Sequence, residues 1–288
     1  MRTTQSTLRA GLTSLALLCL FPSVTSAVSC DTTHISNHAV SQCDCATTFS
    51  DSGCTRCLDA SCNNQPLKGK LTANTCGSGC VDQNINCDAC GLYFNSLCRC
   101  LKGTATNCVS RGNWWLLNAH QLITTTQRVP GILQLGSDNS GWQLGQEILG
   151  SSTVAQSLTR ADGTLSLNSV LVRDQEQIHI HLCENPKSQL RNYLSSPPVR
   201  RDNYQTLKPI PTSFPDYPQG SVRCQASLTK GAANINVAQI TSDYLNTVPK
   251  ACAQDSVGVG LITDGNDYSW VCVTTGEHSG EQLFCGTH

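Results

Sequence analysis

The chain has 288 residues, of which 14% are charged, and its formal net charge at pH 7 is -1. This length suits one large domain or two small ones, with a hydrophobic core of ordinary size. The balanced charge excludes a broad basic surface of the kind that binds nucleic acid or anionic membranes. Any phosphate group therefore has to be bound by a local cluster of side chains.

The first 27 residues have the layout of a cleavable secretory signal. Arg2 and Arg9 precede an apolar run at residues 12–20, and the small residues SVTSA follow at 23–27. That apolar run is too short to cross a membrane. We therefore expect residues 1–27 to be a signal peptide and the mature protein to be exported.

Cysteine usage predicts disulfide bonds. One of 19 cysteines, Cys19, lies in the predicted signal, and thirteen others crowd into residues 30–108. The export signal favours a disulfide-stapled domain at 28–108. The pair spacings, with His34 and His38 nearby, also resemble zinc ligands. Because thirteen and the five later cysteines are both odd numbers, complete pairing requires a bridge between this segment and the rest.

From Trp114 onward the pattern changes to ordinary strands and helices, and we predict a second domain at 109–288. Its first half contains a strand at 114–124, a helix at 142–158 capped by Asn139 or Ser140, and strands at 165–172 and 176–183 that turn near Arg173 and Asp174. Its second half contains a helix at 186–194 opened by Asn185 and Pro186, a proline-rich connection at 196–220, a strand at 221–228, a helix at 237–248, and a hairpin at 257–275 turning at Asp264 and Gly265. This order predicts an α+β domain with an antiparallel sheet.

The run QEQIHIHL at 175–182 places two imidazoles on one face of a strand, because side chains alternate with period two. The odd positions form a polar row: Gln175, Gln177, His179 and His181. The even positions form an apolar row that a core can bury: Ile178, Ile180 and Leu182. The polar row is where we expect the chemistry of the chain.

Three interpretations of this row compete. Hydrogen-bonded structural imidazoles are the first. The second is a metal site similar to that of cupins, with Glu184 as the carboxylate, although the preceding Gly-rich turn is missing. In the third, His179 attacks an activated phosphorus, while His181 and Gln177 bond the phosphoryl oxygens or fix the tautomer of His179.

The run NSVLVRDQEQIHIHLC at 168–183 resembles the CDP-diacylglycerol pyrophosphatase family, a branch of the histidine-triad superfamily of nucleotide hydrolases and transferases. The family's pattern is an Asn-Ser pair, an Arg, a Gln, and then a strand of alternating histidines. These positions fall here on Asn168, Ser169, Arg173, Gln175, His179 and His181. Where the superfamily often has a first histidine, this chain has Gln177.

Two weaker stretches extend the resemblance. TTQRVPGI at 125–132 matches the family's Thr, Arg, Gly and Ile positions with Thr126, Arg128, Gly131 and Ile132. The run at 257–273 is similar to its closing hairpin. The likeness covers residues 98–288, so the front cysteine segment lies outside it.

The resemblance implies a fold and a reaction. The fold is a histidine-triad-like (HIT-like) antiparallel sheet with packed helices, preceded here by the disulfide-rich segment. In the reaction, His179 attacks the phosphorus nearest the nucleoside, phosphatidate leaves, and water releases CMP. His181 is the second choice of nucleophile, and Gln177 completes the catalytic row. Neither a metal nor another cofactor is required.

The phosphate contacts that the resemblance and the local chemistry imply come from polar and cationic side chains. They are Asn168, Ser169, Arg173, Gln175, Arg128, Thr126 and Lys187. Arg191 is a further candidate for neutralising the charge of the leaving phosphate. The expected partner is a small molecule or a lipid that contains a nucleotide, and not a nucleic acid. If the substrate is a lipid, we expect the protein to reach it through peripheral contact with a membrane. No feature identifies an oligomer interface.

An alternative from another class is a secreted binding or wall-associated protein. In that case the cysteine-rich front would be the working part, and the rear domain a silent scaffold. Gln177, in place of a first histidine, keeps this alternative open.

Overall fold

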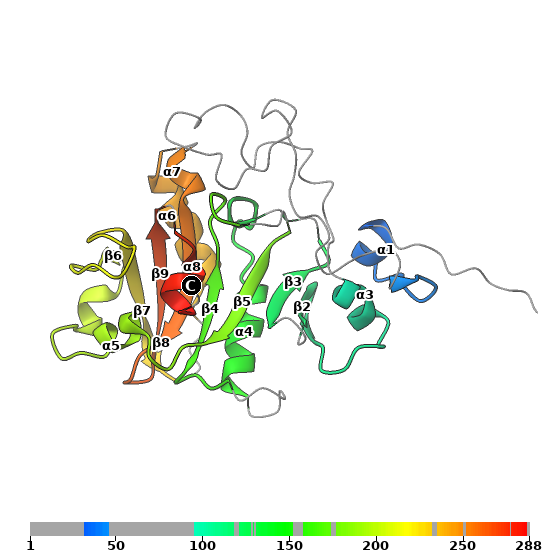
Figure 1. The fold of residues 1–288 in the computed structure, drawn as a ribbon, viewed down its shortest axis with the longest axis horizontal. Helices are drawn as coiled ribbons and strands as arrows, with labels where there is room; N and C mark the ends of the chain where they lie inside the picture. Colours follow the sequence, from blue (N-terminus) through cyan, green and yellow to red (C-terminus); the bar gives the residue numbers. More distant parts are fainter. Residues whose placement is uncertain are drawn as a thin grey trace, which may run out of the picture.

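The computed structural model describes residues 32–45, 95–117, 121–127, 129, 131–151, 158–173, 177–231, 235–249, 252–276 and 278–286. Within them the protein is α+β, and its strands form one antiparallel sheet of nine strands with helices on both faces (Figure 1). The α+β class and the antiparallel sheet predicted from sequence are therefore confirmed.

The sheet has the strand order β1-β2-β3-β5-β4-β8-β9-β7-β6. The strands are β1 (Val109–Arg111), β2 (Trp114–Leu117), β3 (Leu122–Thr125), β4 (Gly163–Leu167), β5 (His179–Glu184), β6 (Lys208–Pro209), β7 (Val222–Lys230), β8 (Val257–Thr263) and β9 (Tyr268–Thr275). The helices are α1 (Thr32–Ser36), α3 (Asn95–Leu101), α4 (Ser140–Gly150), α5 (Gln189–Leu194), α6 (Val237–Thr247), α7 (Cys252–Asp255) and α8 (Gly280–Phe284), with 3-10 turns at Ile132–Gln134 and Arg201–Tyr204.

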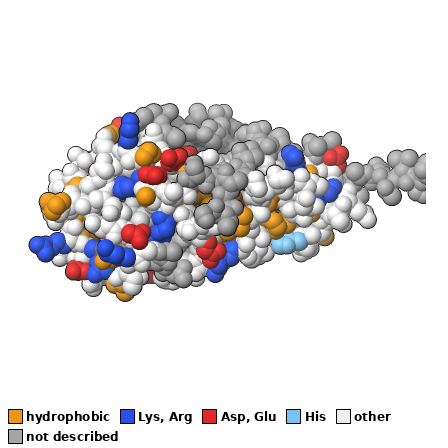
Figure 2. Space-filling model, turned by 90° about the horizontal axis from the view of Figure 1, so that it is seen from below, with side chains coloured by type: hydrophobic (Ala, Val, Ile, Leu, Met, Phe, Trp, Pro, Cys, Tyr) orange, Lys and Arg blue, Asp and Glu red, His pale blue; other side chains and the backbone are white. Residues whose placement is uncertain are grey.

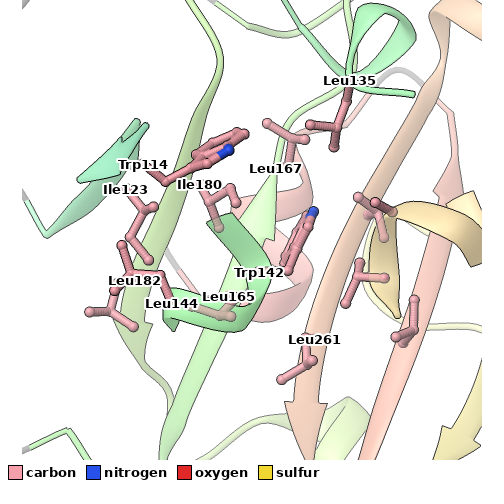
Figure 3. Packing of buried hydrophobic residues seen from close by; sticks show 14 of the residues in the cluster. Trp114, Ile123, Leu135, Trp142, Leu144, Leu165, Leu167, Ile180, Leu182 and Leu261 are labelled. Atoms are coloured by element: carbon pink, nitrogen blue, oxygen red, sulfur yellow. The ribbon is translucent and has the colours of Figure 1, made fainter. Parts of the chain in front are cut away.

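One face of the sheet carries α4 and α6 over the larger hydrophobic core. Figure 3 shows Ile180 and Leu182 of β5 beside Trp142 and Leu144 of α4, and all four side chains are buried. Ile178 belongs to the same core. The even positions of the histidine strand thus face this core, as the alternation predicts, so the odd positions face the other side.

The opposite face carries α5 and α8 over a second core, in which Phe284 and Trp270 are fully buried. Helix α8 lies close to the sheet because Gly260 of β8 has no side chain. A Cβ atom at that position would lie 2.5 Å from the ring of Phe284. The C-terminal helix is therefore held on the same face as the odd positions of β5.

Two predicted elements were wrong in detail. The stretch 114–124 is a hairpin rather than one strand: β2 pairs with β3, and Gln121 adopts a positive φ of 51° just before β3 begins. The short helix begins at Gln189, because the side chain of Ser188 accepts a hydrogen bond from the backbone N–H of Arg191. Asn185 is not its cap, since its side chain donates to the carbonyl of Phe284.

The predicted strand at 165–172 is also wrong in its second half, because β4 ends at Leu167 and residues 168–173 form a turn and loop. Most of the other predicted elements are confirmed. Asn139 occupies the N-cap position of α4, but its side-chain oxygen accepts from the backbone N–H of Ala238 in α6 and makes no capping bond to α4. Helix α4 ends at Gly150, and part of its predicted extension lies outside the described residues. The β8–β9 hairpin turns at Asp264, whose carboxylate accepts from two backbone N–H groups of the turn and from the indole of Trp270. That carboxylate fixes the turn.

Disulfide bonds join Cys45 to Cys98, Cys100 to Cys108, Cys183 to Cys285, and Cys224 to Cys272. They fit an oxidising, extracellular compartment. Four of the five later cysteines thus pair with one another. The predicted bridge from the front segment would then fall to the fifth, Cys252, whose side chain lies outside the described part of the chain.

The described part of the front segment shares a core with the β2–β3 hairpin. Ile35 of α1 and Leu97 of α3 are buried with Leu117 of β2, and Trp115 and Leu122 pack against them. In Figure 1, α1 and α3 lie beside these two strands at one end of the sheet.

No helix among the described residues is long and apolar enough to cross a membrane. Figure 2 shows basic and acidic side chains interspersed on the face it presents, which agrees with the balanced charge of the sequence.

Candidate functional site

The ring of His179 is held in one tautomer. Its Nδ1 atom lies 2.7 Å from the backbone carbonyl oxygen of Gln177. Because a carbonyl oxygen only accepts, Nδ1 carries the proton and the lone pair of the neutral ring is on Nε2. The backbone bend before β5 thus presents one specific nitrogen of His179 as a base or nucleophile.

Burial keeps His179 uncharged. The side chain is 9% exposed, and desolvation together with the neighbouring His181 lowers the pKa of His179 from 6.5 to about 3. The bond to Gln177 and the charge of Glu281 oppose this shift, and the cation of Arg173 adds to it. His179 is therefore neutral throughout the physiological pH range.

His181 lies next to His179 on the same face and is paired with a carboxylate. The two ring centroids are 4.9 Å apart at an interplanar angle of 73°. Nδ1 of His181 lies 3.0 Å from Oε1 of Glu281, which belongs to α8. Since the carboxylate only accepts, this bond fixes Nδ1–H of His181 and leaves Nε2 for proton exchange.

Glu281 is held ionised by a small network. Its other oxygen accepts from Nδ2 of Asn168 at 2.8 Å, and Ser279, the cap of α8, donates to the Asn168 side-chain oxygen at 2.9 Å. Burial alone would raise the pKa of Glu281, but the hydrogen bonds and charge of His181 and the bond from Asn168 lower it to about 2. The carboxylate therefore stabilises positive charge on His181 whenever that ring holds a second proton.

Sequence reasoning missed Glu281 and Ser279. Glu281 lies 100 residues after His181, and only the packing of α8 on the sheet brings the two together. One local signal was available: Ser279 precedes Glu281 by two positions, as a cap precedes an acidic first turn. That signal predicts a helix start but not a carboxylate beside the histidines.

Gln177 contributes to the site through its backbone carbonyl and through hydrogen bonds of its side-chain amide. Its side-chain N–H groups donate to the carbonyls of Thr125 and Gln127, both at 3.0 Å, so the amide fastens the end of β3 to the histidine strand. The backbone carbonyl of Gln177, and not its side chain, fixes the tautomer of His179. Its Oε1 is buried and has no hydrogen-bond partner among the described residues.

Arg173 and Ser169 lie on the loop that follows β4. The backbone N–H of Arg173 donates to the carbonyl of Ser169 at 3.0 Å, which closes a tight turn. The guanidinium of Arg173, 5% exposed, packs directly over Gly131, and a side chain at position 131 would collide with it. The charge of Arg173 acts on His179, as the lowered pKa of that histidine indicates. The glycine of the TTQRVPGI stretch thus makes room for the arginine.

The other predicted contacts have different partners or lie outside the described residues. Thr126 is buried, with its Oγ1 3.5 Å from Nε2 of His38, at the junction with the front segment. Lys187 is exposed in a small pocket beside Asp216. Gln175 and Arg128 fall outside the described residues.

Arg191 is a structural residue and not a phosphate ligand. Its buried guanidinium donates to the carbonyls of Thr263, Gly163 and Asn185, which ties α5 to the ends of β4 and β8. With its donors turned to these carbonyls, it does not face the histidines. The expectation that it neutralises a leaving phosphate is therefore wrong.

Several buried polar atoms near the histidines have no hydrogen-bond partner among the described residues. They are Nε2 of His181 and the hydroxyl oxygens of Ser166 and Ser169. Ser166 pairs directly with His181 across β4 and β5. Buried groups of this kind are normally satisfied by water or by a ligand.

The described residues contain no group of three or more His, Cys, Asp or Glu side chains arranged to hold a metal ion. Glu184, the carboxylate of the metal interpretation, is exposed at the end of β5, where it pairs with Gly163. A larger groove of about 1240 Å³ lies on the other face of the sheet, between β7 and α6, away from the histidines.

Comparison of the sequence with protein-family models and with curated proteins gives no match to either. The chemistry of the site is therefore argued from its own residues. These are a neutral imidazole of fixed tautomer, a second imidazole paired with a carboxylate, and an adjacent buried guanidinium.

The two shifted groups predict how stability depends on pH. The unfolded chain protonates His179 below about pH 6.5 while the folded chain does not until about pH 3, so the free energy of unfolding falls between these values as the pH is lowered. The slope from this one proton is at most about 1.4 kcal/mol per pH unit. Glu281 adds to the loss from pH 4.5 down to about 2.

Replacing His179 by Gln should flatten the slope between pH 6.5 and 4.5, as measured by urea unfolding at a series of pH values. His278→Gln is the matched control, because His278 is exposed, and it should leave the slope unchanged. An unaltered slope in His179→Gln would mean that His179 titrates normally.

Proposed function

We propose that the chain is an exported phosphoric anhydride hydrolase that cleaves a nucleoside diphosphate ester through a nucleotidyl-histidine intermediate. The observation that carries this proposal is the buried, neutral His179 with its proton fixed on Nδ1, beside the His181–Glu281 pair. CDP-diacylglycerol is the substrate suggested by the sequence resemblance, with CMP and phosphatidate as products.

His179 is the proposed nucleophile. In the first step its Nε2 forms a bond to the phosphorus nearest the nucleoside, and the bond from that phosphorus to the bridging oxygen breaks. The imidazole ring becomes positively charged when its Nε2 bonds the phosphorus, and the bond from Nδ1–H to the carbonyl of Gln177 stabilises that charge. A histidine with a pKa of about 3 does not lose its lone pair to a proton at neutral pH.

His181 is the proposed acid and base. Its protonated Nε2 gives a proton to the departing bridging oxygen, and Glu281 stabilises the cation before this transfer. In the second step, water attacks the same phosphorus, the N–P bond breaks, and a proton of the water returns to His181. The nucleoside monophosphate leaves and His179 is restored, so that protons and charge balance over the cycle.

Arg173 and the buried serine hydroxyls are the proposed contacts to phosphoryl oxygens. The cation of Arg173 acts on His179, and the hydroxyl of Ser169 lies on the same loop. Charge-assisted hydrogen bonds from a guanidinium are well suited to the charge that gathers on these oxygens. Asn168 has a different role from the one expected, because its amide positions Glu281.

His179→Ala should abolish turnover, by on the order of 10⁴-fold or more, because no other group would take the nucleotidyl transfer. The assay is a panel of nucleoside diphosphate esters that includes CDP-diacylglycerol. A substrate labelled in the phosphate next to the nucleoside should leave transient label on the wild-type chain and none on His179→Ala. His278→Ala is the control and should retain full activity.

Two results would contradict this assignment. An active His179→Ala variant would show that His179 is not the nucleophile. Turnover of the wild type without protein-bound label would show that no covalent intermediate forms. If the wild-type chain cleaves no member of the panel, the secreted binding protein becomes the better reading of the chain.

Glu281→Gln should lower kcat by about a hundredfold with little change in KM, because the neutral amide no longer stabilises the protonated form of His181. Glu184→Gln is a matched control, since it removes an exposed carboxylate from the end of the same strand, and it should change kcat less than about twofold. Steady-state kinetics of the two variants on one substrate make the comparison. Equal activity of both variants would exclude Glu281 from the reaction.

A further inference from the structure

One disulfide joins the two halves of the candidate site. Cys183 lies on β5, two residues after His181, and Cys285 directly follows α8, four residues after Glu281. The bond closes a sequence separation of 102 residues, with the two Cα atoms 5.5 Å apart. It therefore fastens the helix that carries the carboxylate to the strand that carries its histidine.

We propose that this α8 disulfide (Cys183–Cys285) is a positioning element of the site, which holds Glu281 against His181, and that its reduction lowers turnover. The inference rests on the proposed function, and it adds a redox dependence to it. It concerns positioning only, because neither sulfur lies in the reacting pair.

The need for such a bond follows from the size of α8. A helix of five residues has little stability of its own and depends on tertiary contacts. Noncovalent contacts hold its end: Phe284 is buried, and its carbonyl accepts from the side chains of Thr164 and Asn185. The disulfide at Cys285 adds a covalent link at the same end of α8, about one helical turn after Glu281.

Without the covalent link, local opening of α8 would no longer be restrained by β5. Closing a loop of this length strongly restricts the opened chain in the chain-entropy account. A displacement of about 1 Å in the carboxylate is enough to reduce catalysis severely. Reduction of the bond therefore affects the reaction before it unfolds the domain.

The α8 disulfide is also more accessible than its neighbour in the same domain. Cys183 is partly exposed and Cys285 is 7% exposed, whereas Cys224 and Cys272 are both fully buried. A dithiol reductant can attack the partly exposed sulfur. Two electrons and two protons then pass to Cys183 and Cys285, which become thiols, and the reductant becomes a disulfide.

The test compares two paired variants of the full chain. Cys183→Ser/Cys285→Ser removes the α8 disulfide, and Cys224→Ser/Cys272→Ser removes the buried one as the matched control. We expect kcat to fall about tenfold to a hundredfold in the first and to stay within about twofold in the second. Adding Glu281→Gln to the first variant should lower kcat only slightly further, because both changes remove the same interaction.

A second readout does not require a substrate. Carbon-13 NMR of glutamate carboxyls, with the Glu281 resonance identified from Glu281→Gln, should give a pKa of about 2 in the wild type. That pKa should rise toward 4.5 in Cys183→Ser/Cys285→Ser and stay low in the control variant. A Glu281 pKa that stays low in the first variant would overturn the proposal.

The two readouts separate failure of this inference from failure of the proposed function. If the wild-type chain cleaves no ester but the Glu281 pKa rises as expected in the variant, the positioning role is supported and the proposed reaction is contradicted. If the chain is active and its turnover survives removal of the α8 disulfide, the reaction is supported and the positioning role is contradicted.

If the variant fails to fold, stepwise reduction of the wild type with dithiothreitol replaces it. Alkylation and mass spectrometry identify which cysteines become free. The loss of turnover and the rise of the Glu281 pKa should both follow alkylation of Cys183 and Cys285. If they follow another pair of cysteines, the proposal is wrong.

Discussion

The candidate site depends on the desolvation of His179. When this buried imidazole donates its Nδ1 proton to the carbonyl of Gln177, the lone pair of the neutral ring is on Nε2, and the low dielectric around the ring opposes its protonation. The sheet provides this environment through β3 and β4, which flank β5, and through the α4 core behind it. Positive charge on Arg173, or on His181 when that ring is protonated, is unfavourable in these low-dielectric surroundings. Both residues therefore need a nearby anion.

Glu281 supplies that anion from the far end of the chain. It arrives on α8, whose close approach to the sheet requires the glycine at position 260, and it is oriented by Asn168 and Ser279. Three segments therefore contribute one interacting set: the loop after β4, the next strand β5, and helix α8 from near the end of the chain. Their arrangement explains why a covalent bond between β5 and the end of α8 has a role beyond general stability.

Much of this fold follows from sequence periodicity. Alternation of residues 177–182 correctly gives the apolar face of β5 and the shared face of the two histidines, because a period of two is fixed by strand geometry. Competition between local signals was harder to judge. Asn185 and Ser188 are both residue types that cap helices well. Ser188 caps α5, because the side chain of Asn185 donates its hydrogen bond to the carbonyl of Phe284, in a distant part of the chain. Glu281 was not predictable, since nothing local distinguishes it from a surface carboxylate.

The most direct test of the account is nitrogen-15 NMR of the His179 ring in the folded wild-type chain between pH 4.5 and 8. We expect Nδ1 to be protonated and Nε2 to be unprotonated over this whole range, because the pKa of His179 is about 3. A ring that titrates near pH 6.5, or one that carries its proton on Nε2 at neutral pH, would contradict the account.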